Sequence, residues 1–225
     1  MKSKKNHISV LSRRKKANAA FTLIELLVVI VIIGILAALV TGLAGGASRK
    51  NKVSRIQSDL SRLVTAIEDY KAALGSYPPD NVVIQNGIAQ VRPAGLYYEL
   101  LGTEYLDAQG VFVTLGGVHQ ITPAQAQSFF GRKGFQNSIP GEAQAFLTDV
   151  RNDQKSSLTS DPANPRNEVT VFSAPVDGPN SITGANNVLV NTWKYVSSSP
   201  TNNTASFDLW AELQIGKEIV IISNW

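Results

Sequence analysis

The chain has 225 residues, of which 44% are apolar and 17% charged, and this length supports one sizeable folded domain or two small ones. Its net charge of +4 arises at its start, because residues 1–20 contain seven basic and no acidic residues, whereas residues 21–225 contain 14 basic and 17 acidic ones. This mildly acidic body argues against a nucleic-acid partner. The absence of cysteine excludes disulfides, thiolate zinc sites and cysteine nucleophiles. Two histidines leave little imidazole chemistry, so we expect no enzyme.

Residues 21–43 form an almost uninterrupted apolar stretch in which Glu25 is the single charged residue. About 20 apolar residues suffice to cross a bilayer, so we expect a transmembrane helix here. The basic residues before it place residues 1–20 in the cytoplasm and residues 44–225 across the membrane. Two ordinary interpretations are a secretory signal, whose apolar core is usually only roughly 7–15 residues long, and an uncleaved anchor, which gives Glu25 no partner.

The beginning of the apolar stretch has a characteristic sequence, since residues 19–27 read AAFTLIELL directly after the basic segment. This sequence resembles the cleavage and methylation signal of type IV prepilins and type II secretion pseudopilins. The resemblance implies that a prepilin peptidase cuts between Ala20 and Phe21, removes the cytoplasmic leader 1–20 and methylates the new amino terminus at Phe21. The family usually has glycine where this chain has Ala20; alanine is similarly small, and we expect cleavage.

Glu25 would become the fifth residue of the processed chain. An intramembrane carboxylate is tolerated when it is paired, and cleavage creates a charged amine at Phe21 that methylation preserves. We therefore expect Glu25 and the Phe21 amine, of the same or a neighbouring subunit, to form the contact that sets the register of assembly. The alternative is that Glu25 extends to the membrane interface as an unpaired charge.

The apolar stretch leads into a second helical segment, in which apolar residues recur at intervals of three and four from Val53 to Leu74. Residues 21–44 are thus expected to be the transmembrane half, and residues 45–75 the periplasmic amphipathic half, of one long helix. Gly75 and the prolines after it are typical of a helix end.

Gly34 and Gly42 lower the helix propensity within this long element. The resemblance implies that the helix is locally flexible at such positions when subunits pack into a filament. Close helix packing through a small residue is the alternative.

Residues 76–225 are expected to form a globular head of the α+β class, with a pilin-like arrangement in which the long helix packs on a C-terminal antiparallel sheet. A short helix is predicted at residues 95–101. The segment from about 103 to 187 does not resemble the family and is interpreted as an atypical insertion that decorates the head; within it the patterns predict a strand at 111–115, helices at 123–130 and 141–150, and a loop at 157–167. A β-meander is predicted over 188–225, with strands at 188–196, 206–213 and 217–223.

Relatives of this kind usually bind calcium in a loop between the last two strands, and hard oxygen ligands suit that ion. Here Asp208 and Glu212 are the only carboxylates near that position, so they are weak calcium candidates and we expect no cofactor. Asp208 is instead expected to be an exposed strand residue. His119 has no second histidine in the processed chain and is expected to be a hydrogen-bonded or exposed side chain rather than a metal ligand. The three tryptophans are expected to pack in the core or at its rim.

The resemblance implies a structural subunit of a type II secretion pseudopilus that is anchored once in the bacterial inner membrane, with a periplasmic head, and is polymerised to drive protein export. Its expected partners are further copies of itself, other pseudopilins, the prepilin peptidase, the membrane, and an assembly platform with its ATPase. The alternatives are a type IV pilin for adhesion, motility or DNA uptake, an uncleaved membrane-anchored binding module and an exported enzyme.

Overall fold

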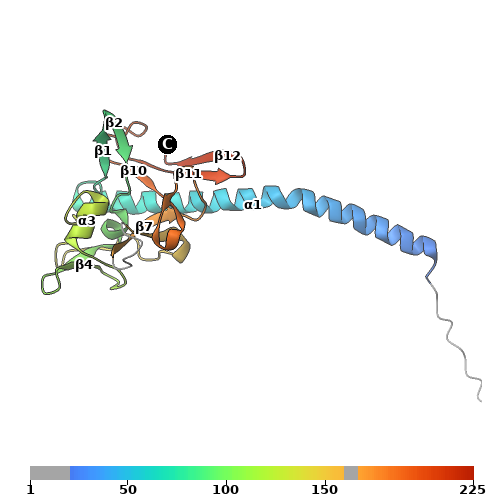
Figure 1. The fold of residues 1–225 in the computed structure, drawn as a ribbon, viewed down its shortest axis with the longest axis horizontal. Helices are drawn as coiled ribbons and strands as arrows, with labels where there is room; N and C mark the ends of the chain where they lie inside the picture. The colour runs from blue at the N-terminus through green and yellow to red at the C-terminus, as the bar shows by residue number, and fades with distance from the viewer. Residues whose placement is uncertain (1–20, 160–166) are drawn as a thin grey trace, which may run out of the picture. The chain divides into compact units, whose positions relative to one another are not determined.

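The computed structural model describes residues 21–159 and 167–225, with side chains for all of these except residues 39–48. The leader 1–20, including Ala20, lies outside the described residues. The chain divides into two compact units, Met1–Ala47 and Ser48–Trp225, which are considered separately below. Helix α1 (Leu23–Leu74) contributes residues to both units (Figure 1).

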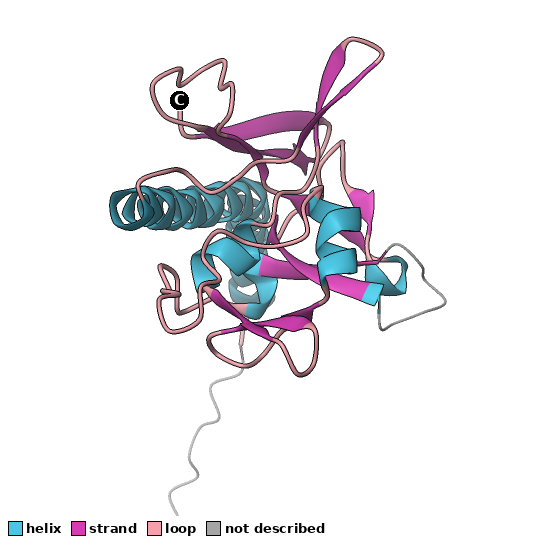
Figure 2. Cartoon of the chain, turned by 90° about the vertical axis from the view of Figure 1, so that its left-hand side faces the viewer, coloured by secondary structure: helices cyan, strands magenta, loops and turns pink. Residues whose placement is uncertain are grey.

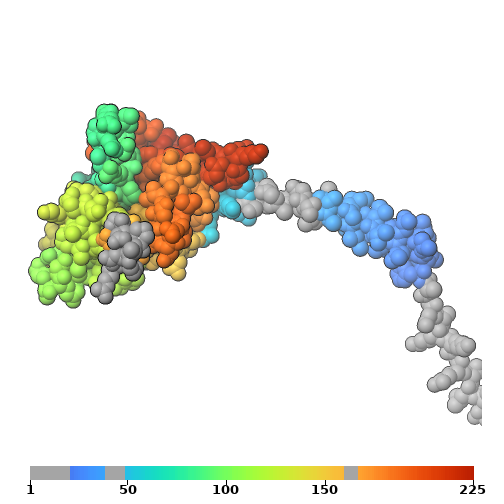
Figure 3. Space-filling view, viewed as in Figure 1, coloured from blue at the N-terminus to red at the C-terminus, as the bar shows by residue number. Residues whose placement is uncertain are grey.

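In the first unit, the described part of α1 is apolar on every side. Side chains that point in different directions are all exposed, for example Leu23 at 83%, Ile30 at 59% and Leu36 at 56% (blue in Figure 3). A helix that is apolar all round normally lies in an apolar environment. Among the residues described with side chains, no helix is both long and apolar enough to cross a membrane. The predicted membrane segment 21–44 extends into residues 39–44, which lie outside the described side chains, and it stays a prediction.

In the second unit, α1 is amphipathic as the spacing predicts. Its large buried apolar residues recur on one face and are Ile56, Leu60, Leu63, Ile67 and Tyr70. The helix ends at Leu74, where the backbone N–H of Gly75 donates to the carbonyl oxygen of Lys71 at 2.8 Å and Gly75 adopts a φ of +81°. Glycine enters this left-handed region without a steric penalty, so the predicted helix end is confirmed.

The strands of this unit form four antiparallel sheets within the described residues. A hairpin joins β1 (Val82–Gln85) and β2 (Ile88–Val91), and a second sheet has the order β3 (Thr103–Leu106), β4 (Val111–Thr114), β5 (Gln120–Ile121). The third has the order β6 (Lys155–Thr159), β7 (Glu168–Ala174), β9 (Leu189–Thr192), β8 (Ile182–Thr183). The C-terminal sheet is a meander of β10 (Lys194–Val196), β11 (Asp208–Ile215) and β12 (Glu218–Ser223).

Four short helices complete the described part of the head. They are α2 (Leu96–Leu101), α3 (Pro123–Phe130), and the 3₁₀ helices η1 (Asn152–Gln154) and η3 (Ala185–Asn187). The predicted helix at 95–101 and the predicted helix at 123–130 are confirmed. Helix α3 begins with a capping box, because the Gln125 backbone N–H donates to Thr122 Oγ1 at 3.1 Å and the Thr122 backbone N–H donates to Gln125 Oε1 at 2.8 Å.

One hydrophobic cluster joins these elements. It combines the buried face of α1 with the inward-facing residues of the C-terminal sheet, Tyr195, Leu209, Ala211 and Leu213. Figures 1 and 2 show this sheet on one side of the head part of α1, with α3 and β4 on the other side. The α+β class and the packing of the amphipathic half on the C-terminal sheet are therefore confirmed.

Residues 103–187 are part of this core rather than a decoration around it. Their buried side chains Phe112, Phe130, Val171 and Phe172 belong to the same cluster as α1 and the C-terminal sheet. Strand β7 is paired on both sides, with β6 and with β9. Whether this segment is an insertion relative to the family stays a prediction, but its removal would take away part of the core.

The predicted strand at 188–196 is wrong as a single element. The chain forms β9 and β10, which are separated by Trp193 and belong to different sheets. Trp193 lies between the two strands, is 4% exposed, and donates its backbone N–H to the carbonyl oxygen of Phe172 at 3.3 Å. The other two predicted strands are found, shifted slightly, as β11 and β12, with Gly216 in the turn at a φ of +66°.

Two further local predictions are wrong. Residues 141–150 form turns and extended backbone instead of a helix, because their N–H groups bond elsewhere: those of Phe146 and Leu147 donate to the carbonyl oxygen of Leu100, and that of Gln144 donates to Asn137 Oδ1. Residues 157–159 belong to β6 instead of the predicted loop, since β7 supplies their ladder partners. Residues 160–166 of that loop lie outside the described residues.

Candidate assembly segment and the head that it carries

The start of α1 is capped by its own side chains. The Thr22 backbone N–H and hydroxyl both donate to Glu25 Oε2, at 2.9 and 2.8 Å, and the Glu25 backbone N–H donates to Thr22 Oγ1 at 3.3 Å. This is a capping box, which satisfies N–H groups that have no partner within the helix. A carboxylate at this position also interacts favourably with the positive end of the helix dipole.

The capping box gives Glu25 a partner in the same chain, which sequence reasoning did not foresee. The pattern Thr-x-x-Glu was the available signal. Glu25 bonds the residue directly after Phe21, so its carboxylate lies at the end of the helix where the amine of a processed chain would be. The pairing of Glu25 with that amine, the cleavage at Ala20 and Phe21, and the methylation of Phe21 stay predictions.

Gly34 lies within the exposed apolar part of α1. A Cβ atom at this position would meet no heavy atom within 4 Å, so packing within the described chain does not require glycine there. Helix flexibility and close packing against a neighbouring helix, the two alternatives given above, both stay predictions. Gly42 lies outside the described side chains, so its predicted role is not tested.

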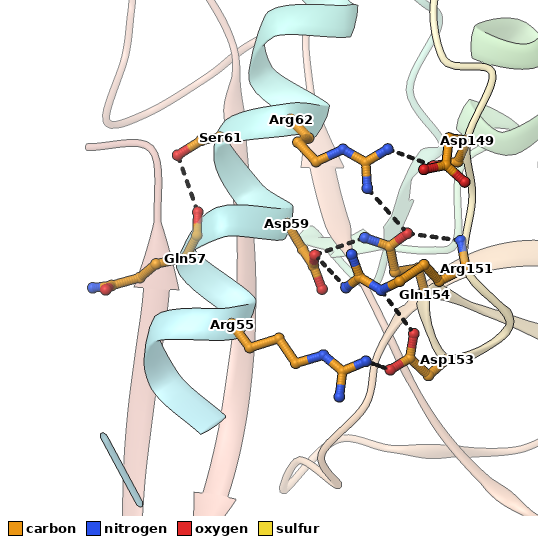
Figure 4. A network of polar contacts seen from close by, with 9 residues as sticks. All are labelled: Arg55, Gln57, Asp59, Ser61, Arg62, Asp149, Arg151, Asp153 and Gln154. Atoms are coloured by element: carbon orange, nitrogen blue, oxygen red, sulfur yellow. Dashed lines mark hydrogen bonds and ion pairs between the residues drawn. The ribbon is translucent and has the colours of Figure 1, made fainter. Parts of the chain in front are cut away.

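A polar network connects the head part of α1 to residues 149–154, as Figure 4 shows. Asp59, which is 3% exposed, accepts hydrogen bonds at Oδ1 from Arg151 Nη2 at 2.8 Å and from Gln154 Nε2 at 2.6 Å. At the edges of the network, Arg55 forms an ion pair with Asp153, and Arg62 donates to the carbonyl oxygen of Asp149. No motif in the sequence indicated this network, because it joins residues about 90 positions apart.

A second buried carboxylate, Glu99 of α2, joins α1 to the loop before residue 138. It accepts hydrogen bonds from the Tyr70 hydroxyl at 2.8 Å and from the backbone N–H groups of Gln136 and Asn137 at 2.9 and 3.0 Å. Burial raises the pKa of Glu99, although these hydrogen bonds oppose the shift. Both buried carboxylates, Asp59 and Glu99, therefore join α1 to other parts of the head. Their described hydrogen bonds are those of structural residues.

The two weak calcium candidates both have protein partners. Asp208 is 2% exposed rather than an exposed strand residue as predicted, and it accepts the backbone N–H groups of Thr201, Asn202 and Asn203 at 2.8, 2.9 and 2.7 Å. Burial raises the pKa of Asp208, but these hydrogen bonds together lower it by more than burial raises it. The pKa of Asp208 therefore lies below its usual value. The carboxylate thus shapes the loop between β10 and β11.

Glu212 accepts hydrogen bonds from Lys194 Nζ at 2.6 Å, Asn180 Nδ2 at 2.7 Å and Trp210 Nε1 at 3.3 Å. Burial raises the pKa of Glu212, but the contacts with Lys194, Trp210 and Asn180 together lower it by more. The pKa of Glu212 therefore lies below its usual value. No group of three or more potential metal ligands occurs within the described residues. The expectation that the chain needs no cofactor stays a prediction.

The remaining singled-out residues are packed or hydrogen-bonded. His119 contacts Thr170 Oγ1 through Nδ1 at 3.1 Å and Lys155 Nζ through Nε2 at 3.4 Å, so the predicted hydrogen-bonded histidine is confirmed. Burial and then the charge of Lys155 lower the pKa of His119. Trp193 lies in the core, whereas the rings of Trp210 and Trp225 contact each other at its rim.

Comparison with known proteins places these features in context. Residues 15–41 match the family described as the prokaryotic N-terminal methylation motif. The chain is also similar to the type II secretion system core protein G of Klebsiella michiganensis, with 37% identity over 87 residues, which are 38% of this chain and 61% of that protein. The match therefore covers less than two thirds of the relative's length. No solved structure matches the chain significantly. The first two findings confirm the resemblance to prepilin-type proteins and to type II secretion pseudopilins.

Proposed function

We propose that this chain, which carries a prepilin-type methylation motif, is a structural subunit of a type II secretion pseudopilus. The observation that carries the proposal is the match of residues 15–41 to that motif at the start of an apolar helix that is exposed on every side. The similarity to a type II secretion core protein G favours secretion over the other uses of such filaments. The role is structural rather than catalytic.

The proposed sequence of events begins with a precursor in the inner membrane, with residues 1–20 in the cytoplasm and the head in the periplasm. A prepilin peptidase cuts before Phe21 and methylates it. An assembly platform and its ATPase then move processed subunits into a filament together with other pseudopilins, with the apolar helices inside and the heads outside. The exposed apolar residues of α1 support this arrangement, because neighbouring helices would cover them.

The first test is mass spectrometry of the amino terminus of the protein purified from the membranes of its native host. The expected result is a chain that begins with N-methylated Phe21. An intact leader would instead leave a membrane-anchored binding module, and a start near Ser48 would leave a secreted domain. Either result would overturn the filament proposal.

A second test distinguishes secretion from piliation. Deletion of the gene should reduce the set of secreted proteins and leave sheared surface fibres unchanged, and a plasmid copy should restore secretion. Loss of surface fibres with normal secretion would favour a type IV pilin and reject a pseudopilus. The similarity to the secretion protein supports the first outcome.

A further inference from the structure

A pocket of about 260 Å³ lies in the second unit, away from the residues discussed above for assembly. It is formed by α2, the end of β4, the loop after it, residues 145–150 and the start of β6. Most of its walls are aliphatic, including Leu101, Leu115, Val118, Leu147 and Val150. Ligand pockets for drug-sized molecules usually measure roughly 300–1,000 Å³, so this pocket fits a smaller molecule.

One charged side chain, Lys155, lines this apolar pocket, and no acidic side chain does. Within the described residues, the Lys155 ammonium forms no ion pair, and its one side-chain contact is with His119 Nε2 at 3.4 Å. A lysine ammonium has three N–H donors. The histidine uses one of them, which leaves two for a ligand in the pocket.

His119 holds this ammonium in place. Because Nε2 faces the Lys155 ammonium, the ring proton belongs on Nδ1, where it is donated to Thr170 Oγ1 at 3.1 Å. The His119 ring also packs edge-to-face on Tyr97, with a centroid distance of 5.2 Å. Lys155 is thereby held by one residue, His119, which is itself anchored by Thr170 and Tyr97, so the lysine loses little further conformational entropy when it binds an anion.

Tyr97 adds a hydroxyl group to the residues that line the pocket. Its side chain is 2% exposed, but its hydroxyl is not among the buried polar atoms without a partner, so the hydroxyl keeps contact with solvent. Because Tyr97 lines the pocket, this hydroxyl can donate to a ligand there. A single cation, a hydroxyl and aliphatic walls together match a molecule with an anionic end and a short apolar chain.

We propose that this pocket binds a small aliphatic carboxylate, with its carboxylate on the Lys155 ammonium, the Tyr97 hydroxyl as a further donor, and its alkyl chain against the aliphatic walls. The charge of Lys155 selects an anion over a neutral or cationic molecule of the same length. The volume selects a short chain over a long acyl tail. This site does not depend on the proposed function.

Equilibrium dialysis tests the site with radiolabelled hexanoate and the full chain in lipid nanodiscs, with empty nanodiscs as the blank. Hexanoate should bind saturably at one molecule per chain. Hexan-1-ol should bind at least about tenfold more weakly, because it lacks the charge-assisted hydrogen bonds, and hexylamine should not compete. Equal affinities for hexanoate and hexan-1-ol, or the absence of saturable binding, would overturn the proposal.

Two variants locate the binding. Lys155→Met keeps the length of the side chain and the backbone pairing of β6, and it should weaken hexanoate binding about tenfold or more. Tyr97→Phe should weaken it by a smaller factor. Lys217→Met and Tyr105→Phe, which lie outside the pocket lining, should bind as the wild type does. Thermal unfolding checks that each variant is folded, and unchanged binding by both pocket variants would contradict the site.

Discussion

The two parts of α1 use apolar residues in opposite ways. In residues 21–38 the apolar side chains are exposed on all sides, and in residues 49–74 they are buried on one face by the head. The head thus covers the apolar face of the second half of the helix within one chain. The apolar side chains of the first half have no such cover within the described residues. Similar side chains in one helix therefore serve folding in the second region, and they would serve the proposed assembly in the first.

The polar residues divide in the same way. Glu25 is exposed and caps the helix start through Thr22, whereas Asp59 and Glu99 are buried and join the helix to the head. A carboxylate that is held locally by a threonine can exchange that partner for another at little cost. A buried carboxylate cannot, since leaving it unpaired is strongly unfavourable.

The largest effect is expected for Glu25→Ala, which should abolish filament assembly while membrane insertion and the stability of the head stay unchanged. The reason is that the variant removes the carboxylate proposed to pair with the Phe21 amine, and Glu25 is not part of the second unit. Sheared filaments measured by immunoblot, with membrane fractionation in parallel, check this outcome. Thr22→Ala, which removes only the hydroxyl of the capping box, is the matched control and should still assemble. Normal filaments from Glu25→Ala would contradict the proposed pairing.

The next largest effect is a difference in unfolding free energy when the same substitution, isoleucine to alanine, is made in each half of α1. Ile67→Ala, at a fully buried position, should lower the free energy of unfolding of the head by about 2–5 kcal/mol. Ile30→Ala, at a position that is 59% exposed, should change it by less than about 0.5 kcal/mol. Denaturant unfolding in nanodiscs, followed by the fluorescence of the three tryptophans, measures both. Equal effects would mean that the two halves do not differ as described.

A smaller effect is expected for Arg151→Ala, which leaves buried Asp59 with Gln154 as its remaining side-chain partner. We expect a loss of about 1–3 kcal/mol of unfolding free energy. Arg55→Ala breaks an exposed ion pair with Asp153 and should lower it by less than about 1 kcal/mol. The same unfolding experiment compares the two variants, and a larger loss for Arg55→Ala would reverse the assignment of Asp59 as the central residue.

The smallest effect concerns pH. Because the pKa of Asp208 is lower in the folded head than in the unfolded chain, its contribution to stability is present above its unfolded value of about 3.9 and is lost as the pH falls through the folded value. Asp208→Asn should therefore show a shallower loss of stability between pH 5 and pH 2 than the wild type. Unfolding curves at a series of pH values measure the two slopes. Parallel slopes would show that the loop hydrogen bonds do not stabilise the charged form.

The sequence predicts those parts of the molecule whose causes are local. The apolar spacing from Val53 to Leu74 and the stop at Gly75 predict the second half of α1. Helix α3 was predicted at its observed position, and Thr122 and Gln125 cap its start. The methylation motif was also recognisable, because its residues are contiguous. Each of these features depends on neighbours within a few positions along the chain.

The errors arise where distant residues decide the structure. Residues 141–150 have a helical pattern, but the carbonyl oxygen of Leu100 and the amide of Asn137 take their hydrogen bonds. Asp208 was interpreted as exposed, since nothing in the strand pattern shows that the loop at 201–203 folds over its carboxylate. The network around Asp59 was missed for the same reason.

Trp193 gives the head a mechanical property. The chain passes from β9 in the four-stranded sheet to β10 in the C-terminal sheet across this one buried side chain. A force that separated the two sheets would have to pull the indole out of the core and break ladders on both sides at once, instead of opening one ladder bond after another. We therefore expect a load applied to either sheet to be shared by both, which would suit a subunit of the proposed filament.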